Sequence, residues 1–344
     1  MTFDTMHLSA GMRAFIDTAS SFASEHDDWP SRRAAFARQC AHFTPPAPDG
    51  VKAIDRTLGG VRTRCILPPG QPPVGGWPVL VFFHGGGWTT GDHTTHDWFA
   101  HALLARIDIA VLMVDYRLAP EASFPAPIVD GLAVWDAMAG AGLPLDCARR
   151  AVGGDSAGGT LAAALCVALQ LRGNTQPAAQ LLLYPVLSAR TDFDSICEHA
   201  NAPMLTARGL AGSIALYLPC EADRHDALAM PLEGDGGGNL APALVAVAQY
   251  DPLRDQGLAY AKRLTAAGGQ AAAWYGDGLV HACLRAPWLP EVDVLYTRIA
   301  AFLIERGLAV VRGDATSEGA VNDGGEERGA GGAAGPLSIE DQGA

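Results

Sequence analysis

Six short apolar runs alternate with longer segments between residues 78 and 306. The residues within each run are almost all apolar, which is typical of strands buried on both faces of a mainly parallel sheet. The segments between them have the length and composition of helices. The predicted strands are 79–83, 109–114, 151–152, 181–184, 244–248 and 271–275, and the predicted helices are 94–106, 125–139, 157–172, 255–267 and 292–306. The pattern therefore predicts an α/β fold with a mainly parallel central sheet flanked by helices.

Four further segments fall outside this alternation. Residues 51–67 predict an edge hairpin that turns at two glycines. Residues 1–50 predict one or two helices and a linker, and residues 188–238 break the alternation with helical periods. We expect these two segments to form a helical cap over a main domain made of residues 51–187 and 239–312. Residues 313–344 are rich in Gly, Ala, Asp and Glu, so they predict a disordered acidic tail.

The composition excludes several classes of function. The chain has 344 residues and a net charge of −13, and its Lys and Arg residues form no cluster that could follow a phosphate backbone. Charged residues interrupt the first twenty positions, which argues against a signal peptide, and the longest apolar run is too short to span a bilayer. We therefore expect a cytoplasmic protein with neither nucleic acid nor membrane as a partner.

The cysteines give no sign of a disulfide framework or a metal site. Seven cysteines are scattered along the chain without a Cys-x-x-Cys pair. An odd, dispersed set is typical of free thiols in a reducing compartment. We therefore expect no metal ion.

A serine between a predicted strand and a predicted helix is the first candidate for chemistry. Gly154-Asp155-Ser156-Ala157-Gly158 fits the Gly-x-Ser-x-Gly pattern of a nucleophile elbow, in which a sharp turn exposes the serine hydroxyl. Small residues are required there because side chains beside a turn this tight would clash. The helix that follows would direct its N-terminus at Ser156, where free N–H groups favour a developing oxyanion.

A histidine and an acid follow the serine in the order that such a hydrolase requires. His281 lies after the predicted strand 271–275 and a turn at residues 276–278, while His199 and His225 fall within the predicted cap. Asp251 directly follows the strand 244–248, and Asp277 competes with it for the role of the acid. Because Asp277 is so close to His281 in sequence, it is better suited to shape the turn. The predicted catalytic residues are therefore Ser156, Asp251 and His281.

A glycine-rich loop follows the strand 79–83. Its sequence is His84-Gly85-Gly86-Gly87-Trp88, and consecutive glycines leave backbone N–H groups unobstructed. In this type of site, such a loop supplies oxyanion donors together with the residue after the nucleophile, here Ala157. Trp88 could line a substrate channel, although packing beside the turn is an equally good interpretation.

Together these motifs resemble the hormone-sensitive-lipase-like bacterial esterases, family IV of the α/β hydrolases. The resemblance covers residues 45–308 and includes the HGGG loop, Asp115-Tyr116-Arg117-Leu118-Ala119-Pro120-Glu121, the elbow with its flanking glycines, Asp251-Pro252-Leu253-Arg254-Asp255 and His281. It implies the α/β-hydrolase fold, a cap over the acyl pocket, and cleavage of short- to medium-chain acyl esters without a cofactor. It also implies that the substrate is a small-molecule ester and that the chain forms a homodimer.

The resemblance implies roles for further residues. The backbone N–H groups of Gly85, Gly86, Gly87 and Ala157 would form the oxyanion hole. Trp88 and Asp155, which flank these motifs, are the candidate substrate-binding residues. An ion pair between Arg117 and Glu121 would support the HGGG loop. The family usually places Gly-Phe after its histidine, whereas this chain has Ala282-Cys283, which could change the pocket wall.

Two other functions remain open from the sequence. The same three residues could cleave amides, formamides or carbamates, or remove acetyl groups from a sugar or an antibiotic. A protein with this fold could also be a small-molecule receptor that has lost turnover. The presence of all three predicted catalytic residues favours an enzyme.

Overall fold

The computed structural model describes residues 3–234 and 238–312. Its centre is an eight-stranded sheet with the order β1-β2-β5-β3-β6-β7-β8-β9. The pairs β1–β2 and β2–β5 are antiparallel, and all the other neighbours are parallel. The strands are β1 (Lys52–Leu58), β2 (Val61–Leu67), β3 (Trp77–Phe83), β5 (Ala110–Val114), β6 (Leu145–Asp155), β7 (Ala179–Leu183), β8 (Ala243–Tyr250) and β9 (Ala271–Val280). The predicted α/β fold, with its mainly parallel sheet and edge hairpin, is confirmed.

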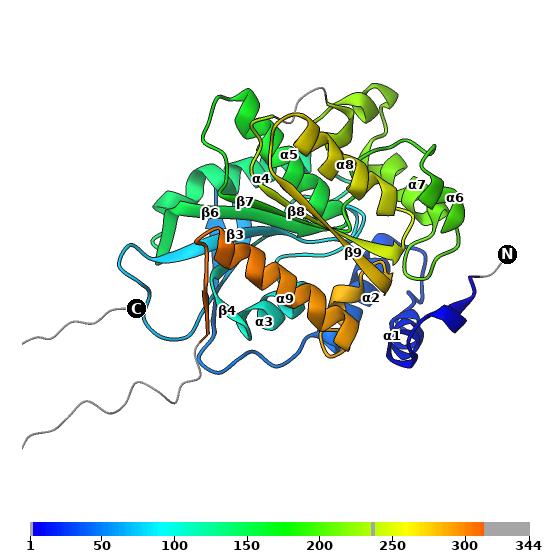
Figure 1. The fold of residues 1–344 in the computed structure, drawn as a ribbon, viewed down its shortest axis with the longest axis horizontal. Coiled ribbons are helices and arrows are strands. Elements are labelled where there is room, and N and C mark those ends of the chain that lie inside the picture. The colour runs from blue at the N-terminus through cyan, green and yellow to red at the C-terminus, as the bar shows by residue number, and fades with distance from the viewer. Residues whose placement is uncertain (1–2, 235–237, 313–344) are drawn as a thin grey trace, which may run out of the picture. The chain divides into compact units, whose positions relative to one another are not determined.

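Helices cover both faces of the sheet, as Figure 1 shows. One face carries α4 (Ala126–Ala137), α5 (Ala157–Leu171) and α8 (Arg254–Ala266), and the other carries α3 (Asp97–Leu104) and α9 (Pro290–Glu305). Alternate side chains of β3 enter the two apolar cores: Val79, Val81 and Phe83 enter one, while Leu80 and Phe82 enter the other. Burial on both faces explains why this strand reads as an unbroken apolar run.

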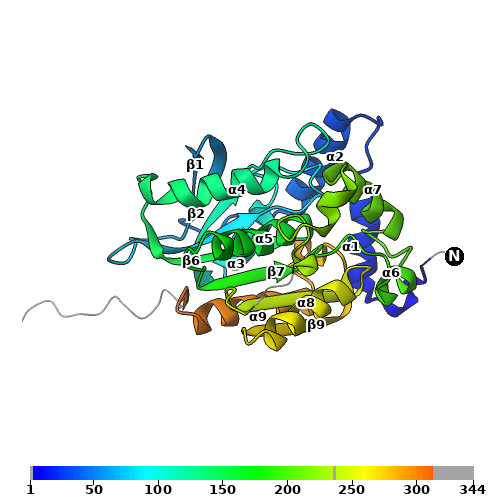
Figure 2. The ribbon, with the colours of Figure 1, turned by 90° about the horizontal axis from the view of Figure 1, so that it is seen from above.

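Four helices lie at the edge where the parallel strands end: α1 (Ala10–Ser20), α2 (Trp29–Phe43), α6 (Asp194–Glu198) and α7 (Ala207–Tyr217) (Figures 1 and 2). Their starts follow local sequence signals, since Ser9, Asp28 and Thr206 accept hydrogen bonds from backbone N–H groups of the first turns of α1, α2 and α7. The helix α1 packs into one core and α7 into the other. The N-terminal helix α1 and the helix α7 therefore approach the same edge from opposite faces of the sheet.

Short elements complete the described structure. A small antiparallel sheet joins β4 (Ile107–Asp108) to β10 (Val310–Val311). The short helices are η1 (Thr5–His7), η2 (Met138–Gly140), η3 (Glu221–His225), η4 (Pro231–Glu233) and η5 (Cys283–Arg285). In residues 3–234 and 238–312, none of the helices combines the length and apolar character needed to cross a bilayer. The predicted acidic tail, 313–344, lies outside the described residues.

The predicted turn at residues 276–278 is wrong. The strand β9 continues through these residues to Val280. Its pairing with β8 shifts register between Ala248 and Tyr250, and it resumes where Tyr250 pairs with Val280. Gly278 adopts a φ of 70° and donates its N–H to Gln249. The glycines therefore accommodate an irregularity within a strand, so the strand carries His281 directly at its end.

Candidate active site

Ser156 occupies the sharp turn between β6 and α5. Its φ is 54°, which is a strained value for a residue with a side chain. The flanking glycines are sterically necessary. A Cβ on Gly154 would lie 2.3 Å from the carbonyl carbon of Gly158, and a Cβ on Gly158 would lie 2.0 Å from the carbonyl oxygen of Phe83. The elbow therefore forms as its sequence predicts, and it holds the Ser156 side chain at the edge of the sheet.

The three predicted catalytic side chains lie in contact with one another. The Nε2 atom of His281 is 2.9 Å from the Oγ of Ser156, and its Nδ1 is 2.7 Å from Oδ2 of Asp251. Asp251 is fully buried, whereas Ser156 and His281 are 8% and 6% exposed. The hydroxyl and imidazole can therefore be reached from outside, while the carboxylate is closed off from water.

Neighbouring groups hold the acid and the imidazole in place. The backbone N–H of Leu253 donates to Oδ1 of Asp251 at 2.9 Å, which leaves Oδ2 for the histidine. The ring of Tyr184 packs against the imidazole, with 4.9 Å between ring centroids. Burial raises the pKa of Tyr184 well above its ordinary value, so this tyrosine stays neutral. The structure thus fixes the histidine between its two partners.

The residues that competed for these roles lie elsewhere. Asp277 is an exposed residue of β9. The Nε2 of His199 lies 2.9 Å from Nη1 of Arg254, and His225 ends η3. His281 is therefore the histidine that contacts Ser156, and Asp251 is the acid that contacts His281.

Gly86 and Gly87 of the glycine-rich loop line the same cavity as Ser156, but the N–H of Gly85 is occupied. The N–H of Gly85 donates to Oδ1 of Asp155 at 2.8 Å, so its predicted role in the oxyanion hole is wrong. Within the described residues, no hydrogen bond occupies the N–H groups of Gly86, Gly87 and Ala157. Gly86 and Gly87 have φ values of 118° and 60°, which glycine adopts without strain.

Comparisons with known proteins agree with this geometry. A family model described as the alpha/beta hydrolase fold matches residues 80–285. The chain is 40% identical to the esterase LipI of Mycobacterium tuberculosis over 233 residues, which cover 67% of this chain and 72% of LipI. It is 35% identical to the ethyl acetate hydrolase of Pseudomonas putida over 244 residues, which cover 69% of this chain and 77% of the relative. The solved structure of an esterase from the bacterial hormone-sensitive lipase family has a TM-score of 0.79 and 31% identity, covering 88% of this chain and 99% of that chain.

This chain belongs to the hormone-sensitive-lipase-like esterases. It is a carboxylic ester hydrolase with the α/β-hydrolase fold. The family resemblance of the sequence motifs is confirmed.

The two residues predicted to contact substrate in this esterase are held by the protein itself. Trp88 is fully buried and stacks on Tyr217 of α7, with ring centroids 4.2 Å apart. Oδ1 of Asp155 accepts the Gly85 N–H and lies 3.2 Å from Nε2 of His96. Both residues line the cavity at Ser156, but their side chains chiefly fix the glycine-rich loop against its surroundings.

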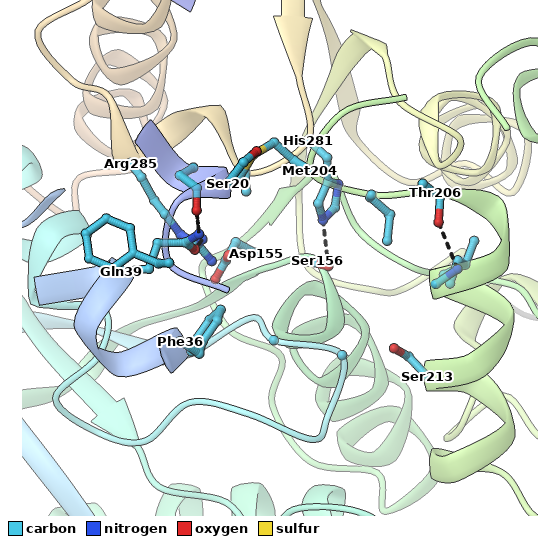
Figure 3. A pocket seen from close by; sticks show the side chains of 18 of the residues that line it. Ser20, Phe36, Gln39, Asp155, Ser156, Met204, Thr206, Ser213, His281 and Arg285 are labelled. Carbon is cyan, nitrogen blue, oxygen red and sulfur yellow. Dashed lines mark hydrogen bonds between the residues drawn. The ribbon is translucent and has the colours of Figure 1, made fainter. Parts of the chain in front are cut away.

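The cavity above Ser156 has a volume of about 580 Å³. Its walls come from α1, α2 and α7, from the glycine-rich loop and from the residues after His281. Figure 3 shows Phe36, Gln39 and Arg285 to one side of Ser156, with Thr206 and Ser213 to the other. No local sequence motif marks these residues, so the sequence alone does not predict their place in the cavity.

The predicted ion pair between Arg117 and Glu121 is wrong. Arg117 instead pairs with Asp130 of α4 at 2.8 Å, and Glu121 pairs with Arg33 of α2 at 2.6 Å. Arg33 also donates to the carbonyl oxygen of Thr89, which follows the glycine-rich loop. The loop is therefore tied to α2 rather than braced by its own neighbours in sequence.

Ala282 takes the position where the family usually has glycine, and its backbone conformation is strained for an alanine. Its φ of 60° lies in the left-handed region, where an alanine is less stable than a glycine. We expect Ala282→Gly to stabilise the esterase by about 0.5–1 kcal/mol, which would raise the melting temperature by about 2 °C. Differential scanning calorimetry would measure this shift.

The matched control is Ala301→Gly in the middle of α9. There the same substitution should lower stability by about 0.5–1 kcal/mol, because glycine loses more backbone entropy in a helix. An Ala282→Gly variant that melts at or below the temperature of the wild type would contradict the strain at Ala282.

Proposed function

We propose that this esterase cleaves short- to medium-chain acyl esters by serine acyl transfer. Ser156 would act as the nucleophile, His281 as the general base and Asp251 as the group that orients the imidazole. The observation that carries the proposal is the continuous path of contacts from Asp251 through His281 to Ser156, with distances of 2.7 and 2.9 Å. This path ends at the floor of the cavity, where an ester can reach the hydroxyl.

The proposed reaction has two halves. His281 takes the proton of the Ser156 hydroxyl as the oxygen attacks the ester carbonyl, and then gives that proton to the departing alcohol. Water attacks the resulting acyl-enzyme with the same base, which releases the carboxylic acid and restores the serine. In both halves, Asp251 would hold the Nδ1 proton and stabilise the imidazolium that forms.

The N–H groups of Gly86, Gly87 and Ala157 would stabilise the tetrahedral oxyanion. Two come from the glycine-rich loop and one from the first residue of α5, so the proposed donors belong to separate elements. The loss of one such donor typically raises the barrier by about 2.7–4 kcal/mol. Because the donors are backbone groups, what matters at these three positions is the backbone conformation and not the chemistry of the side chain.

We also propose that α1, α2, α6 and α7 form the cap of the acyl-binding pocket. Residues of α1, α2 and α7 line the cavity, and these helices come from the two segments that interrupt the main fold. A cavity of about 580 Å³ is within the usual range of small-molecule sites. Its partial enclosure favours acyl groups of limited length.

The test is a series of p-nitrophenyl esters from acetate to dodecanoate, together with p-nitroacetanilide as the matching amide. We expect kcat/KM to be highest among the acetate-to-hexanoate esters and to fall for longer chains, with the amide turned over far more slowly. Hydrolysis of the anilide at a rate similar to that of p-nitrophenyl acetate would favour an amidase instead. The absence of turnover on every ester would contradict the proposal.

A further inference from the structure

A buried guanidinium lines the cavity beside Ser156. Arg285 belongs to η5, four residues after His281, and it is only 5% exposed. It lies among the residues that form the cavity wall, and Figure 3 shows it near Gln39 and Asp155. The proposed reaction gives this arginine no role.

The protein provides Arg285 with few partners. Nη1 donates to Oε1 of Gln39 at 2.5 Å, and the guanidinium carbon lies 4.9 Å from the centre of the Phe36 ring. The Nε atom is buried without a hydrogen-bond acceptor. Among the residues that the structure describes, no aspartate or glutamate forms an ion pair with this side chain. A neutral amide and an aromatic face thus hold a charge that burial makes costly.

The acidic side chains near Arg285 do not form an ion pair with it. Asp155 is the one carboxylate among the residues that line the cavity, and it already accepts from Gly85 and contacts His96. Burial alone would raise the pKa of Asp155, but His96, Arg285 and the Gly85 N–H hold it below its ordinary value. Burial also raises the pKa of the nearby Cys40 thiol to about 11, so that group is neutral. Asp155 and Cys40 therefore leave the Arg285 guanidinium without a directly bonded anion.

We propose that this esterase prefers esters that carry a free carboxylate, with Arg285 as the residue that binds it. A guanidinium presents its N–H groups in a planar fork that matches a carboxylate, and such charge-assisted hydrogen bonds strengthen in a site closed to water. The substrate class includes half-esters of dicarboxylic acids and O-acyl hydroxy acids. This inference rests on the proposed function, because it assumes that the ester carbonyl meets Ser156.

The two sides of the cavity fit such a substrate. The wall toward α2 holds Arg285, Gln39 and Phe36. The wall formed by α7 includes the apolar side chain of Leu210. The carboxylate would bind at the first wall, and the uncharged part of the substrate would lie along the second.

Two pairs of substrates test the preference. In the first pair, mono-p-nitrophenyl adipate is compared with its uncharged adipamate, so the charge lies on the acyl side. In the second, γ-acetoxybutyrate is compared with γ-acetoxybutyramide, so the charge lies on the alcohol side. We expect the wild type to favour the carboxylate member of at least one pair by about 10-fold or more in kcat/KM. The favoured pair identifies the side of the scissile bond that faces Arg285.

The variant Arg285→Met should lower this ratio by about 10- to 100-fold. Arg285→Lys keeps the positive charge but lacks the planar guanidinium, so it should retain a smaller preference for the carboxylate substrate than the wild type. The matched control is Arg306→Met at the C-terminal end of α9, because Arg306 also bonds a glutamine and lies over a phenylalanine ring, yet it does not line the cavity. It should keep the ratio of the wild type.

Wild-type ratios at or below one in both pairs would overturn the inference, and so would an Arg285→Met variant that keeps the ratio of the wild type. Calorimetric titration of Ser156→Ala with monoethyl adipate and ethyl adipamate gives a readout without turnover. Tighter binding of the carboxylate supports the inference, and equal binding contradicts it. If no ester is hydrolysed, the proposed function fails, but this titration still decides the role of Arg285.

Discussion

Ser156→Ala is expected to lower kcat for p-nitrophenyl acetate by about 10⁶-fold. The substitution removes the only hydroxyl that His281 contacts among the described residues, while the oxyanion donors and the cavity remain. The residual rate would reflect binding and the oxyanion hole alone. Steady-state kinetics on freshly purified protein would measure the loss, and circular dichroism would show that the fold is kept.

Ser31→Ala is the matched control. Ser31 lies in α2 but does not line the cavity, so its hydroxyl has no access to the ester. We expect its kcat to stay within about twofold of the wild type, as for a surface substitution away from the site. A Ser156→Ala variant that retains a tenth of wild-type kcat would show that another group attacks the ester.

Asp251→Asn is the second large effect, with an expected loss of about 10⁴-fold in kcat. The buried carboxylate accepts a hydrogen bond from His281 Nδ1, which leaves Nε2 free to take the serine proton. An amide in its place can donate to Nδ1 and so favour the wrong tautomer. The substitution keeps the shape of the side chain, so stability should change much less than activity.

Asp277→Asn provides the comparison. Asp277 lies closer to His281 in sequence, but it is exposed on β9, and the hydrogen bonds of the imidazole go to Asp251 and Ser156. Its activity should equal that of the wild type in the same assay. Equal losses in both variants, or a larger loss at Asp277, would show that the acid has been assigned to the wrong residue.

The sequence contained enough to predict both the sheet and the three side chains at Ser156. Continuous apolar runs marked the buried strands, and the functional groups of such a sheet gather where its strands end. Asp251 and His281 each follow a strand that pairs in parallel with its neighbour, so the topology brings both to Ser156. The two residues are 30 positions apart in the chain, so the order of the strands, and not a local motif, predicts that they meet.

Details that depend on tertiary partners could not be predicted. The Gly85 N–H is occupied because it donates a hydrogen bond to the side chain of Asp155, which lies 70 residues later in the chain. Arg117 and Glu121 are close in the chain, yet each pairs with a residue on a different helix. Arg285 gains its position in the cavity from Gln39, which is 246 residues distant. A pattern along one chain does not encode such choices among competing partners.

The most direct test of the central claim is labelling with a fluorophosphonate probe, followed by mass spectrometry of the peptides. Such a probe reacts with a serine that a neighbouring base has activated. We predict one adduct per chain, located on Ser156, with loss of esterase activity in proportion to labelling. An active preparation that carries no adduct on Ser156, or keeps its full activity after complete labelling there, would contradict the account.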